Sequence, residues 1–333
     1  MITPFGLRHI GLLREMQNDS VTLDVKSSLR DTETPLRIAL RGYFAPSRAG
    51  NYTHVLHAPD RGQALRGFAQ VNAHKSGLSW TIVRMAPQVH QLEDAASTIW
   101  YRLLLHLCIA AGERQVQRLF AALPEGHPAD EVFRQASFAA YCREHMFRLP
   151  EAAAAQGQLS ARIRPASADN AFDIQKLYYR ITPRLVLQTA EPNGQPGGSS
   201  LLDVGTADAP QGYVLYGAKS ELAGYMYFLW GARGWWLRLI ADRDAGDSIG
   251  EMLDHALALL SNHAPRPIYC ALREYEGGVQ APLADRGFVL TDTYRLMVKH
   301  TTVQVKVPKR KLVPAMEKRA EIAPTISQSN SKS

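Results

Sequence analysis

Hydrophobic and polar residues alternate in two separate stretches of the chain, and alternation of this kind predicts β-strands. The first stretch covers residues 65–82 (LRGFAQVNAHKSGLSWTI), and the second covers residues 222–240 (LAGYMYFLWGARGWWLRLI). In each stretch a turn containing glycine, at Gly77 or at Gly231 and Gly234, separates two strands, and the second strand opens on tryptophan. Each stretch therefore predicts a β-hairpin.

The elements that follow the two hairpins also correspond. Apolar residues recur at helical spacing in residues 100–112 and again in residues 250–263. A short strand that is apolar on both faces comes next, in residues 117–125 and in residues 267–276. Each half then closes with a short helix and a long strand. The order strand–strand–helix–strand–helix–strand thus occurs twice, about 150 residues apart.

Single positions agree with this repeat. Phe138 and Phe288 fall at equivalent points before the last strands, and Ser137 stands where Gly287 does. Because so long an ordered set of elements is not expected twice by chance, the sequence predicts a duplication.

The length of the chain fits two domains. A chain of 333 residues is too long for one ordinary core and has room for two domains of about 150 residues each. We expect a first domain at 1–149, a linker at 150–160 and a second domain at 161–303, followed by a basic, disordered tail at 304–333. Residues 35–44 (PLRIALRGYF) predict an opening helix of the first domain.

The second domain is expected to open with a strand and a helix. Residues 161–165 predict a short strand, Asp169 is expected to cap the helix, and Pro183 is expected to interrupt it. The predicted inner face of this helix consists of Phe172, Ile174, Leu177 and Tyr178.

Most of the positive charge lies in the predicted tail. The whole chain has a net charge of +7, and residues 306–333 contain seven Lys or Arg against two Glu. The remaining 305 residues carry only +2, which argues against a nucleic-acid partner for the folded part.

Cysteine use and the N-terminus point to a reducing compartment. The three cysteines are widely spaced and form no C-x-x-C pair; they are Cys108, Cys142 and Cys270. Arg8, Arg14 and Glu15 interrupt any signal-peptide core. The strongest apolar stretch, residues 99–111, is too short to span a bilayer. We therefore expect a cytoplasmic protein with no membrane partner.

The second half resembles the GNAT superfamily of N-acetyltransferases. The resemblance rests on the order of the strand RIRPAS (162–167), the helix after it, the central hairpin, the strand–loop–helix segment at 236–260 and the late ADRGF segment (284–288). It covers residues 160–300 well and residues 53–149 less well. It implies an α/β fold with a mixed sheet, built as two tandem GNAT-like domains. It also implies transfer of an acetyl group from acetyl-CoA to an amine of a small molecule or peptide.

The resemblance further implies a place for the diphosphate of acetyl-CoA in residues 235–257. Family members hold the pantetheine arm on the backbone of a splayed central strand, and a glycine-rich loop then opens a helix whose free N–H groups receive the phosphates. Gly250 matches a family glycine, Ser248 is a small replacement, and Ala245 stands where a cation is usual. The positions implied to contact acetyl-CoA are Leu239, Ile240, Arg243, Gly246, Ser248, Ile249 and Gly250.

Two features of this loop favour other interpretations. Asp247 would repel a diphosphate. Ser248 and Glu251 also have the spacing of a capping box, which begins a helix for local reasons alone. In the first half the counterpart loop, residues 85–104, has no glycine, and Trp100 stands in the place of Gly250. We expect that this half does not bind CoA.

The general acid that the family usually employs is missing. Many members have a Tyr four residues before the Gly of a Gly-Phe pair and an Asn near the end of the preceding strand; these positions are Leu283 and Glu276 here. The carboxylates predicted near the cleft, as candidates for a general base, are Glu274, Glu276 and Asp242, and each is alternatively a solvated rim residue. Tyr275 and Tyr294 are candidate substitute acids.

Other chemistries fit the sequence less well. The G-x-S-x-G pattern at 246–250 matches a hydrolase nucleophile elbow, but residues 242–245 separate it from the strand. The pairs His54-x-x-His57 and Cys142-x-x-His145 lie in predicted strands, where such residues face opposite sides, so no metal site is expected. Two hypotheses remain: an N-acetyltransferase with its site in the second domain, and a catalytically inactive tandem scaffold or ligand sensor.

Overall fold

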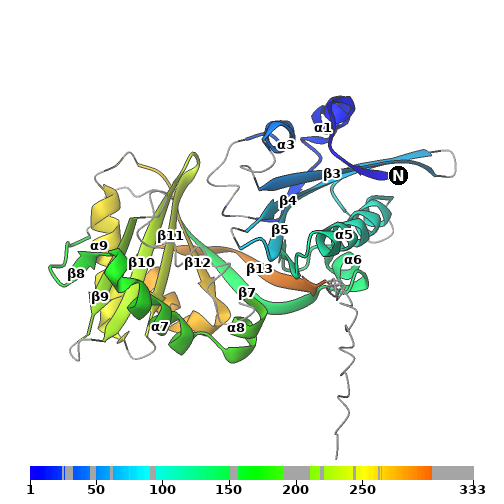
Figure 1. The fold of residues 1–333 in the computed structure, drawn as a ribbon. Coiled ribbons are helices and arrows are strands. Elements are labelled where there is room, and N and C mark those ends of the chain that lie inside the picture. Colours follow the sequence, from blue (N-terminus) through cyan, green and yellow to red (C-terminus); the bar gives the residue numbers. More distant parts are fainter. Residues whose placement is uncertain are drawn as a thin grey trace, which may run out of the picture. The chain divides into compact units, whose positions relative to one another are not determined.

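One mixed sheet runs through both halves of the chain. The fold is that of a computed structural model describing residues 1–24, 26, 33–45, 50–60, 63–74, 76–90, 95–150, 157–190, 211–217, 221–242, 245–261, 263 and 265–301. Within these ranges the strands follow the order β1-β3-β4-β5-β6-β13-β7-β12-β11-β10-β9-β8, and β2 pairs with β5 (Figure 1). The strands are β1 (Ile2–Pro4), β2 (Val21–Thr22), β3 (Asn51–Asp60), β4 (Gln63–Ala73), β5 (Ser79–Ala86), β6 (Arg118–Pro124), β7 (Ala139–Leu149), β8 (Ile163–Pro165), β9 (Gln211–Tyr216), β10 (Leu222–Gly231), β11 (Gly234–Ala241), β12 (Ile268–Arg273) and β13 (Val289–His300).

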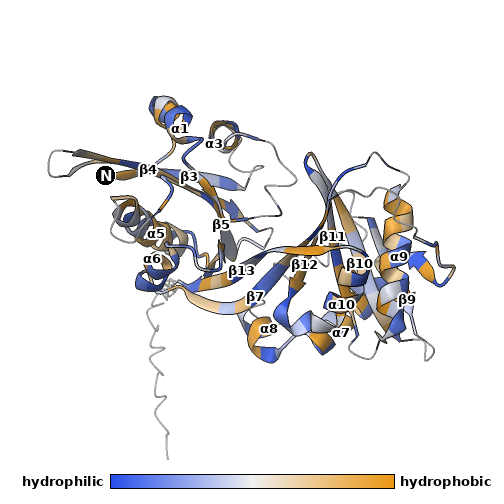
Figure 2. Ribbon diagram, turned by 180° about the vertical axis from the view of Figure 1, so that it is seen from behind, coloured by the Kyte–Doolittle hydropathy of each residue, from blue (hydrophilic) through white to orange (hydrophobic). Residues whose placement is uncertain are grey.

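Helices pack on both faces of this sheet. In the first half the helices are η1 (Leu7–His9), α1 (Ile10–Met16), α3 (Pro35–Phe44), α5 (Ala95–Glu113) and α6 (Asp130–Gln135). In the second half they are η2 (Ala168–Asn170), α7 (Ala171–Ile181), α8 (Arg184–Ala190), α9 (Asp247–Ser261), η5 (Glu274–Val279) and α10 (Gln280–Asp285). Hydrophobic residues recur along α9, which therefore packs one face on the sheet (Figure 2).

Alternate residues of β11 show which helix covers which face. Leu237 and Leu239 join the core cluster that contains the buried residues of α9. Trp236 and Ile240 join a different cluster, which contains the buried residues of α7. Since successive side chains of a strand point to opposite faces, α9 and α7 lie on opposite sides of the second half's sheet.

The last strands of the two halves are exchanged. β7, which ends the first half, pairs with β12 of the second half from Leu149 opposite Ile268 to Glu144 opposite Arg273. β13, which ends the second half, pairs with β6 of the first half. β7 and β13 also pair with each other. The repeated order of elements is as predicted, but each half is completed by a strand from the other.

Most predicted elements are present, and two detailed predictions about helix α7 are wrong. Residues 35–44 form a helix, and Pro183 separates α7 from α8, as predicted. The prediction that Asp169 caps the helix is wrong, because Asp169 lies inside η2. At this point it is Asn170 whose Oδ1 accepts a backbone N–H, that of Ser167, at 2.8 Å. Phe172 is 74% exposed, so its placement on the inner face is also wrong.

The predicted domain boundaries remain predictions. Residues 151–156 of the linker and all of the tail at 304–333 lie outside the described ranges. The exchanged strands also mean that a boundary in the sequence near residue 150 does not coincide with a boundary in the sheet.

Helix α5 is longer than the apolar stretch from which it was predicted. It spans Ala95–Glu113 and, among the described residues, is the one helix with the length and composition of a membrane span. Half of its most apolar window is buried, and Trp100, Leu103, Leu104 and Leu107 belong to the first half's core. The helix is thus long enough to span a bilayer, unlike the stretch 99–111 considered in the sequence, but a core helix of a folded protein can have the same length and composition.

Ser137 and Gly287 are equivalent in backbone conformation as well as in sequence. Each follows the short helix before the last strand of its half, and their φ angles are +62° and +82°. This left-handed region costs an L-residue about 1–2 kcal/mol but costs glycine little. The duplicated turn therefore carries strain only in the first half.

A buried histidine of β3 contacts a half-buried histidine of α5. His54 is 2% exposed, and its Nδ1 lies 3.0 Å from Nε2 of His106. Burial, followed by the charges of His106 and Arg114, lowers the pKa of His54 to about 4. His57, three residues along β3, is exposed, as the strand assignment predicted.

Replacing Ser137 with glycine is expected to raise the free energy of unfolding by about 1 kcal/mol, because glycine adopts a positive φ without steric cost. Ser137 is exposed, so the change removes no core contact. Gly287→Ser is the matched reverse substitution and is expected to lower the free energy by a similar amount. Urea unfolding curves measure both changes, and destabilisation by Ser137→Gly would contradict the equivalence of the two turns.

The His54 pair is expected to make stability depend on pH. The pKa of His54 is lowered in the folded state, so the unfolded chain binds a proton first as the pH falls from about 6.5 to about 4. The free energy of unfolding is therefore highest above pH 6.5 and falls as the pH drops to about 4. His54 accounts for about 3 kcal/mol of this decrease. Urea unfolding at pH 7 and pH 4 measures the loss. His54→Gln, which does not titrate, should lose less, and an equal loss in both proteins would exclude His54 as a source.

Candidate functional site

Strands β11 and β12 separate soon after they begin to pair. They run in parallel from Trp235 opposite Ile268 to Leu237 opposite Cys270. The pairing ends there, although both strands continue further. An opening therefore lies between residues 238–241 of β11 and residues 271–273 of β12.

The first half contains the same arrangement. β5 and β6 pair in parallel only over residues 79–81 and 118–120, and both strands then continue beyond the paired part. Both halves thus contain the splayed central strands that the sequence resemblance implies. Their surroundings are different.

An ion pair spans the opening in the second half. Nη1 of Arg238 donates to the carbonyl oxygen of Leu239 at 3.1 Å and, across the opening, to that of Ala271 at 3.0 Å. The guanidinium also donates to both carboxylate oxygens of Glu276, at 2.8 and 2.5 Å. Glu276 accepts in addition the backbone N–H of Arg273 at 2.9 Å. The Arg238–Glu276 pair therefore ties β11, β12 and η5 together.

Burial makes this pair strong and fixed. The side chains of Arg238 and Glu276 are 5% and 4% exposed. Burial alone lowers the pKa of Arg238, but the adjacent carboxylate of Glu276 outweighs that effect, and the pKa is raised above its ordinary value. The guanidinium consequently stays charged. Because three donors already occupy the Glu276 carboxylate, the structure gives Glu276 a structural role, and its role as a general base remains a prediction.

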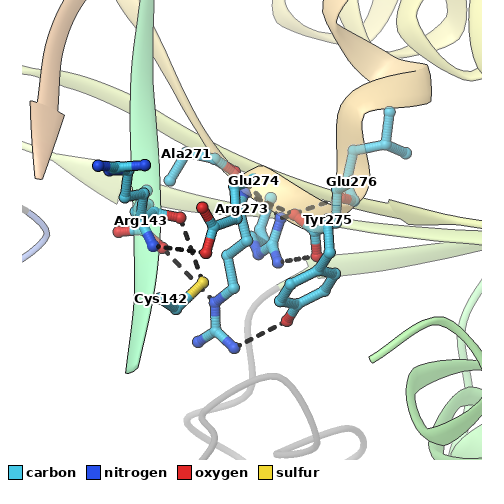
Figure 3. A network of polar contacts seen from close by, with 10 residues as sticks. Cys142, Arg143, Ala271, Arg273, Glu274, Tyr275 and Glu276 are labelled. Carbon is cyan, nitrogen blue, oxygen red and sulfur yellow. Dashed lines mark hydrogen bonds and ion pairs between the residues drawn. The ribbon is translucent and has the colours of Figure 1, made fainter. Parts of the chain in front are cut away.

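The other two predicted carboxylates are also engaged. Glu274 accepts the backbone N–H of Arg143, on the exchanged strand β7, at 3.2 Å (Figure 3). Asp242, just after β11, forms an ion pair with Arg180 of α7. The structure thus places the three candidates around the end of the opening, each bound to a different element, rather than together in one cluster.

The tyrosine candidates keep their protons. Burial raises the pKa of Tyr275, whose hydroxyl oxygen accepts a hydrogen bond from Nη1 of Arg273 at 3.0 Å (Figure 3). Burial, followed by Asp292 and Glu144, raises the pKa of Tyr294 to about 12. Leu283, at the position of the family's usual acid, is a fully buried core residue. Tyr275 and Tyr294 therefore remain the candidate side chains for donating a proton in place of the family's usual tyrosine.

Helix α9 begins close to the end of β11. Gly246 has a φ of +46°, and the position where its Cβ would stand has no other atom within 4 Å. A Cβ on Gly250 would instead lie 2.9 Å from Nη2 of Arg286. Arg286 is held there by Asp254, with 2.7 Å between each pair of atoms. The helix start is thus open on the side of Gly246 and partly covered by a cation at Gly250.

A cavity of about 600 Å³ lies beside this helix start. Gly246 and Gly250 line it together with Arg286. Four carboxylates also line it, and they belong to Asp247, Glu251, Asp254 and Asp285. The surplus of negative charge disfavours a diphosphate, as Asp247 alone predicted from the sequence.

The capping-box interpretation of this helix start is wrong. The carboxylate of Glu251 accepts from Oγ of Ser160 at 2.5 Å and from Nη1 of Arg162 at 2.8 Å. It is therefore bound to the segment that enters the second half. It does not reach back toward Ser248.

The remaining positions implied for acetyl-CoA divide into three groups. Leu239, Ile240 and Ile249 are buried in the core, so only their backbone is available, and the carbonyl of Leu239 already accepts from Arg238. Ser248 lies in the first turn of α9 and is half-buried. Arg243 lies outside the described ranges.

In the first half, Trp100 fills the space next to the splayed strands. It is fully buried, its Nε1 donates to the carbonyl oxygen of Pro87 at 2.6 Å, and its ring stacks on His127. A side chain of this size leaves no room for a ligand at the place of Gly250. That the first half does not bind CoA remains a prediction, and the burial of Trp100 is consistent with it.

Sequence reasoning missed the two arginines that shape the site. Arg238 interrupts the apolar run GWWLRLIA of β11, and a single cation in a buried strand signals a buried partner. Arg286 belongs to the ADRGF segment, but nothing in the sequence pairs it with Asp254. In the described part of the chain, no group of three or more His, Cys, Asp or Glu is placed to hold a metal ion.

Two solved structures share this fold. One is a GCN5-related N-acetyltransferase from Sphaerobacter thermophilus, with a TM-score of 0.51 and 9% identity over 90% of this chain and 95% of that chain. The other is a tandem GNAT protein from the clavulanic acid biosynthesis pathway, solved without AcCoA, with a TM-score of 0.52 and 12% identity over 92% of this chain and 99% of that chain. No protein-family model and no curated protein matches the sequence. The chain has the mixed α/β fold of GNAT acetyltransferases, in a form that a tandem GNAT protein shares along nearly its whole length.

Removing one partner of the Arg238–Glu276 pair is expected to destabilise the protein strongly. Glu276→Leu leaves a buried, unpaired guanidinium and should lower the free energy of unfolding by about 3–5 kcal/mol. The double variant Arg238→Met, Glu276→Leu removes both charges and should recover most of that loss. Urea unfolding of the single and double variants measures the difference. Equal losses in the two would show that the pair is not coupled as described.

Proposed function

We propose that this chain is an acyl-CoA-dependent N-acyltransferase that acetylates an amine acceptor, with its site in the second half. The observation that carries the proposal is the opening between β11 and β12, followed directly by a helix start with Gly246 and Gly250. Backbone N–H groups at such a helix start favour phosphate. The acceptor is a small molecule or a peptide amine.

The backbone of the site fits acetyl-CoA better than its side chains do. Gly246 leaves the start of α9 open on its side, and Arg286 supplies a cation next to Gly250. Asp247 faces the same cavity and weakens the attraction for phosphate. When bound, acetyl-CoA supplies an activated thioester, whose acyl carbon forms a bond to the acceptor nitrogen while the bond to sulfur breaks.

The protein's own residues would position the acceptor and handle protons. The general base is expected among Glu274, Glu276 and Asp242, of which Glu274 has the fewest partners, since it accepts one backbone hydrogen bond. Tyr275 holds a proton that it can donate, because burial raises its pKa. Arg273 orients the Tyr275 hydroxyl at 3.0 Å.

A second candidate function is a non-catalytic scaffold or ligand sensor. Two observations favour it: the Arg238–Glu276 pair spans the opening, and carboxylates dominate the cavity beside α9. This candidate predicts either no binding of acetyl-CoA or binding without turnover of any amine.

Isothermal titration with acetyl-CoA tests the proposed site. Gly250→Trp should abolish binding by filling the cavity, while Asp247→Asn should tighten it severalfold by removing a repulsive charge. Thr98→Trp is the control, because it places the same side chain at an exposed residue in the first turn of α5. This variant should bind as the wild type does. Absence of binding at millimolar acetyl-CoA would remove the proposed function.

A further inference from the structure

Several buried polar atoms on the α7 side of the second half lack a hydrogen-bond partner. Within the described residues these include the hydroxyl of Tyr178, Nε of Arg273, the hydroxyl of Tyr225 and Nε1 of Trp236. Oγ1 of Thr182, at the end of α7, is a fifth. All five carry a proton that they can donate.

These donors belong to one region of the fold. Tyr178, Tyr225 and Trp236 are members of the core cluster under α7. Arg273 ends β12 two residues after Ala271, which is a member of the same cluster, so it points to the same face. This face lies opposite α9, on the other side of the opening between β11 and β12.

Arg273 is an incompletely paired guanidinium. Its Nη1 donates to the hydroxyl of Tyr275 at 3.0 Å, and its side chain is 16% exposed. Glu144, on the exchanged strand β7, lies 3.8 Å from Nε, which is too far for a hydrogen bond. Figure 3 shows the guanidinium extended between Cys142 of β7 and Tyr275 of η5.

Tyrosines surround this guanidinium. Burial lowers the pKa of Arg273, but the nearby groups outweigh burial and raise it well above its ordinary value; these groups are Tyr275, Tyr178, Tyr141 and Glu144. Tyr178 and Ala271 belong to one core cluster, and Arg273 lies two residues after Ala271, so Tyr178 packs on the face to which Arg273 points. Tyr178 is fully buried, and its hydroxyl has no partner.

Unpartnered donors that share one face of the sheet with a cation favour a ligand that only accepts hydrogen bonds. Leaving such donors buried and unpaired costs free energy, which a ligand with suitable oxygens would recover. A carboxylate offers two oxygens with several lone pairs and forms charge-assisted hydrogen bonds with a guanidinium.

The position of Arg273 links this ligand to the opening. Its backbone N–H donates to Glu276, which is part of the ion pair that spans the opening. Arg273 therefore lies at the edge of this opening, on the face of the sheet away from α9.

We propose that the acceptor amine carries a carboxylate, as an amino acid does, and that Arg273 and the Tyr178 hydroxyl receive this carboxylate. The inference rests on the proposed acyltransferase function and specifies its substrate class. It also assigns the exchanged strand a part in the site, because Tyr141 and Glu144 come from β7.

The test compares each L-amino acid with the amine obtained by removing its carboxyl group. For the best acceptor, kcat/KM with acetyl-CoA should be about 10- to 100-fold higher for the amino acid, which is the worth of a charge-assisted hydrogen bond. Tyr178→Phe should reduce this preference without lowering the free energy of unfolding, because the hydroxyl has no partner to lose. Arg273→Gln should abolish the preference, and Arg273→Lys should restore part of it.

Tyr216→Phe is the matched control. The Tyr216 hydroxyl accepts from Asn170 at 2.9 Å and donates to Asp173 at 2.9 Å, so its loss should lower stability and leave the preference unchanged. A Tyr178→Phe variant that is less stable but equally selective would overturn the proposal.

A binding measurement separates this proposal from the function on which it rests. N-acetyl-L-amino acids and the matching N-acetyl amines are added to the apoprotein, and thermal unfolding is followed. The compounds with a carboxylate should raise the melting temperature, and Tyr178→Phe should diminish that effect. If acetyl-CoA binds and both members of each pair react equally, the carboxylate site is wrong and the transferase stands. If acetyl-CoA does not bind, the transferase is wrong, and the thermal shifts alone decide whether the carboxylate site exists.

Discussion

The exchange of the last strands is the constraint on which the rest of the fold depends. Phe147 and Leu149 of β7 belong to the core under α9, although they come from the first half. Met297 of β13 belongs to the core under α5, although it comes from the second half. Each hydrophobic core is therefore complete only when the other half contributes a strand. An unpaired edge on β6 or β12 would otherwise expose backbone donors and acceptors to water.

This exchange also joins the halves chemically. β7 supplies Cys142, Arg143 and Glu144 to the polar network at the end of β12, and Glu274 and Arg273 bind or approach them. The first half thus contributes its last strand to the polar network of the second half.

The two halves use the same splayed strands in different ways. In the first half Trp100 occupies the space beside the opening, and hydrophobic packing stabilises the result. In the second half the helix start is open at Gly246 and partly covered by Arg286 at Gly250, while Arg238 and Glu276 hold the strands from within the opening. A buried ion pair contributes less net stability than packing does, because both charges lose their hydration. What it preserves is a polar opening with fixed geometry, beside which the donors of Arg273 and Tyr178 lie.

The sequence by itself determined the elements and their repetition. Alternation predicted the hairpins, and helical spacing predicted α5 and α9. These signals are local, because each depends on residues that are neighbours in the chain. The tertiary structure alone decided that β7 and β13 change places, that Arg238 binds Glu276, and that Glu251 binds Ser160 and Arg162. These pairings join residues that lie far apart in the chain: Arg238 and Glu276 are 38 positions apart, and Ser160 and Glu251 are 91 positions apart. Many other residues of the chain have the same chemistry as these partners, so no periodicity in the sequence identifies which partner is bound. Phe172 shows the same limit within one helix: its spacing fitted the inner face, but the rotation of α7 on the sheet left it exposed.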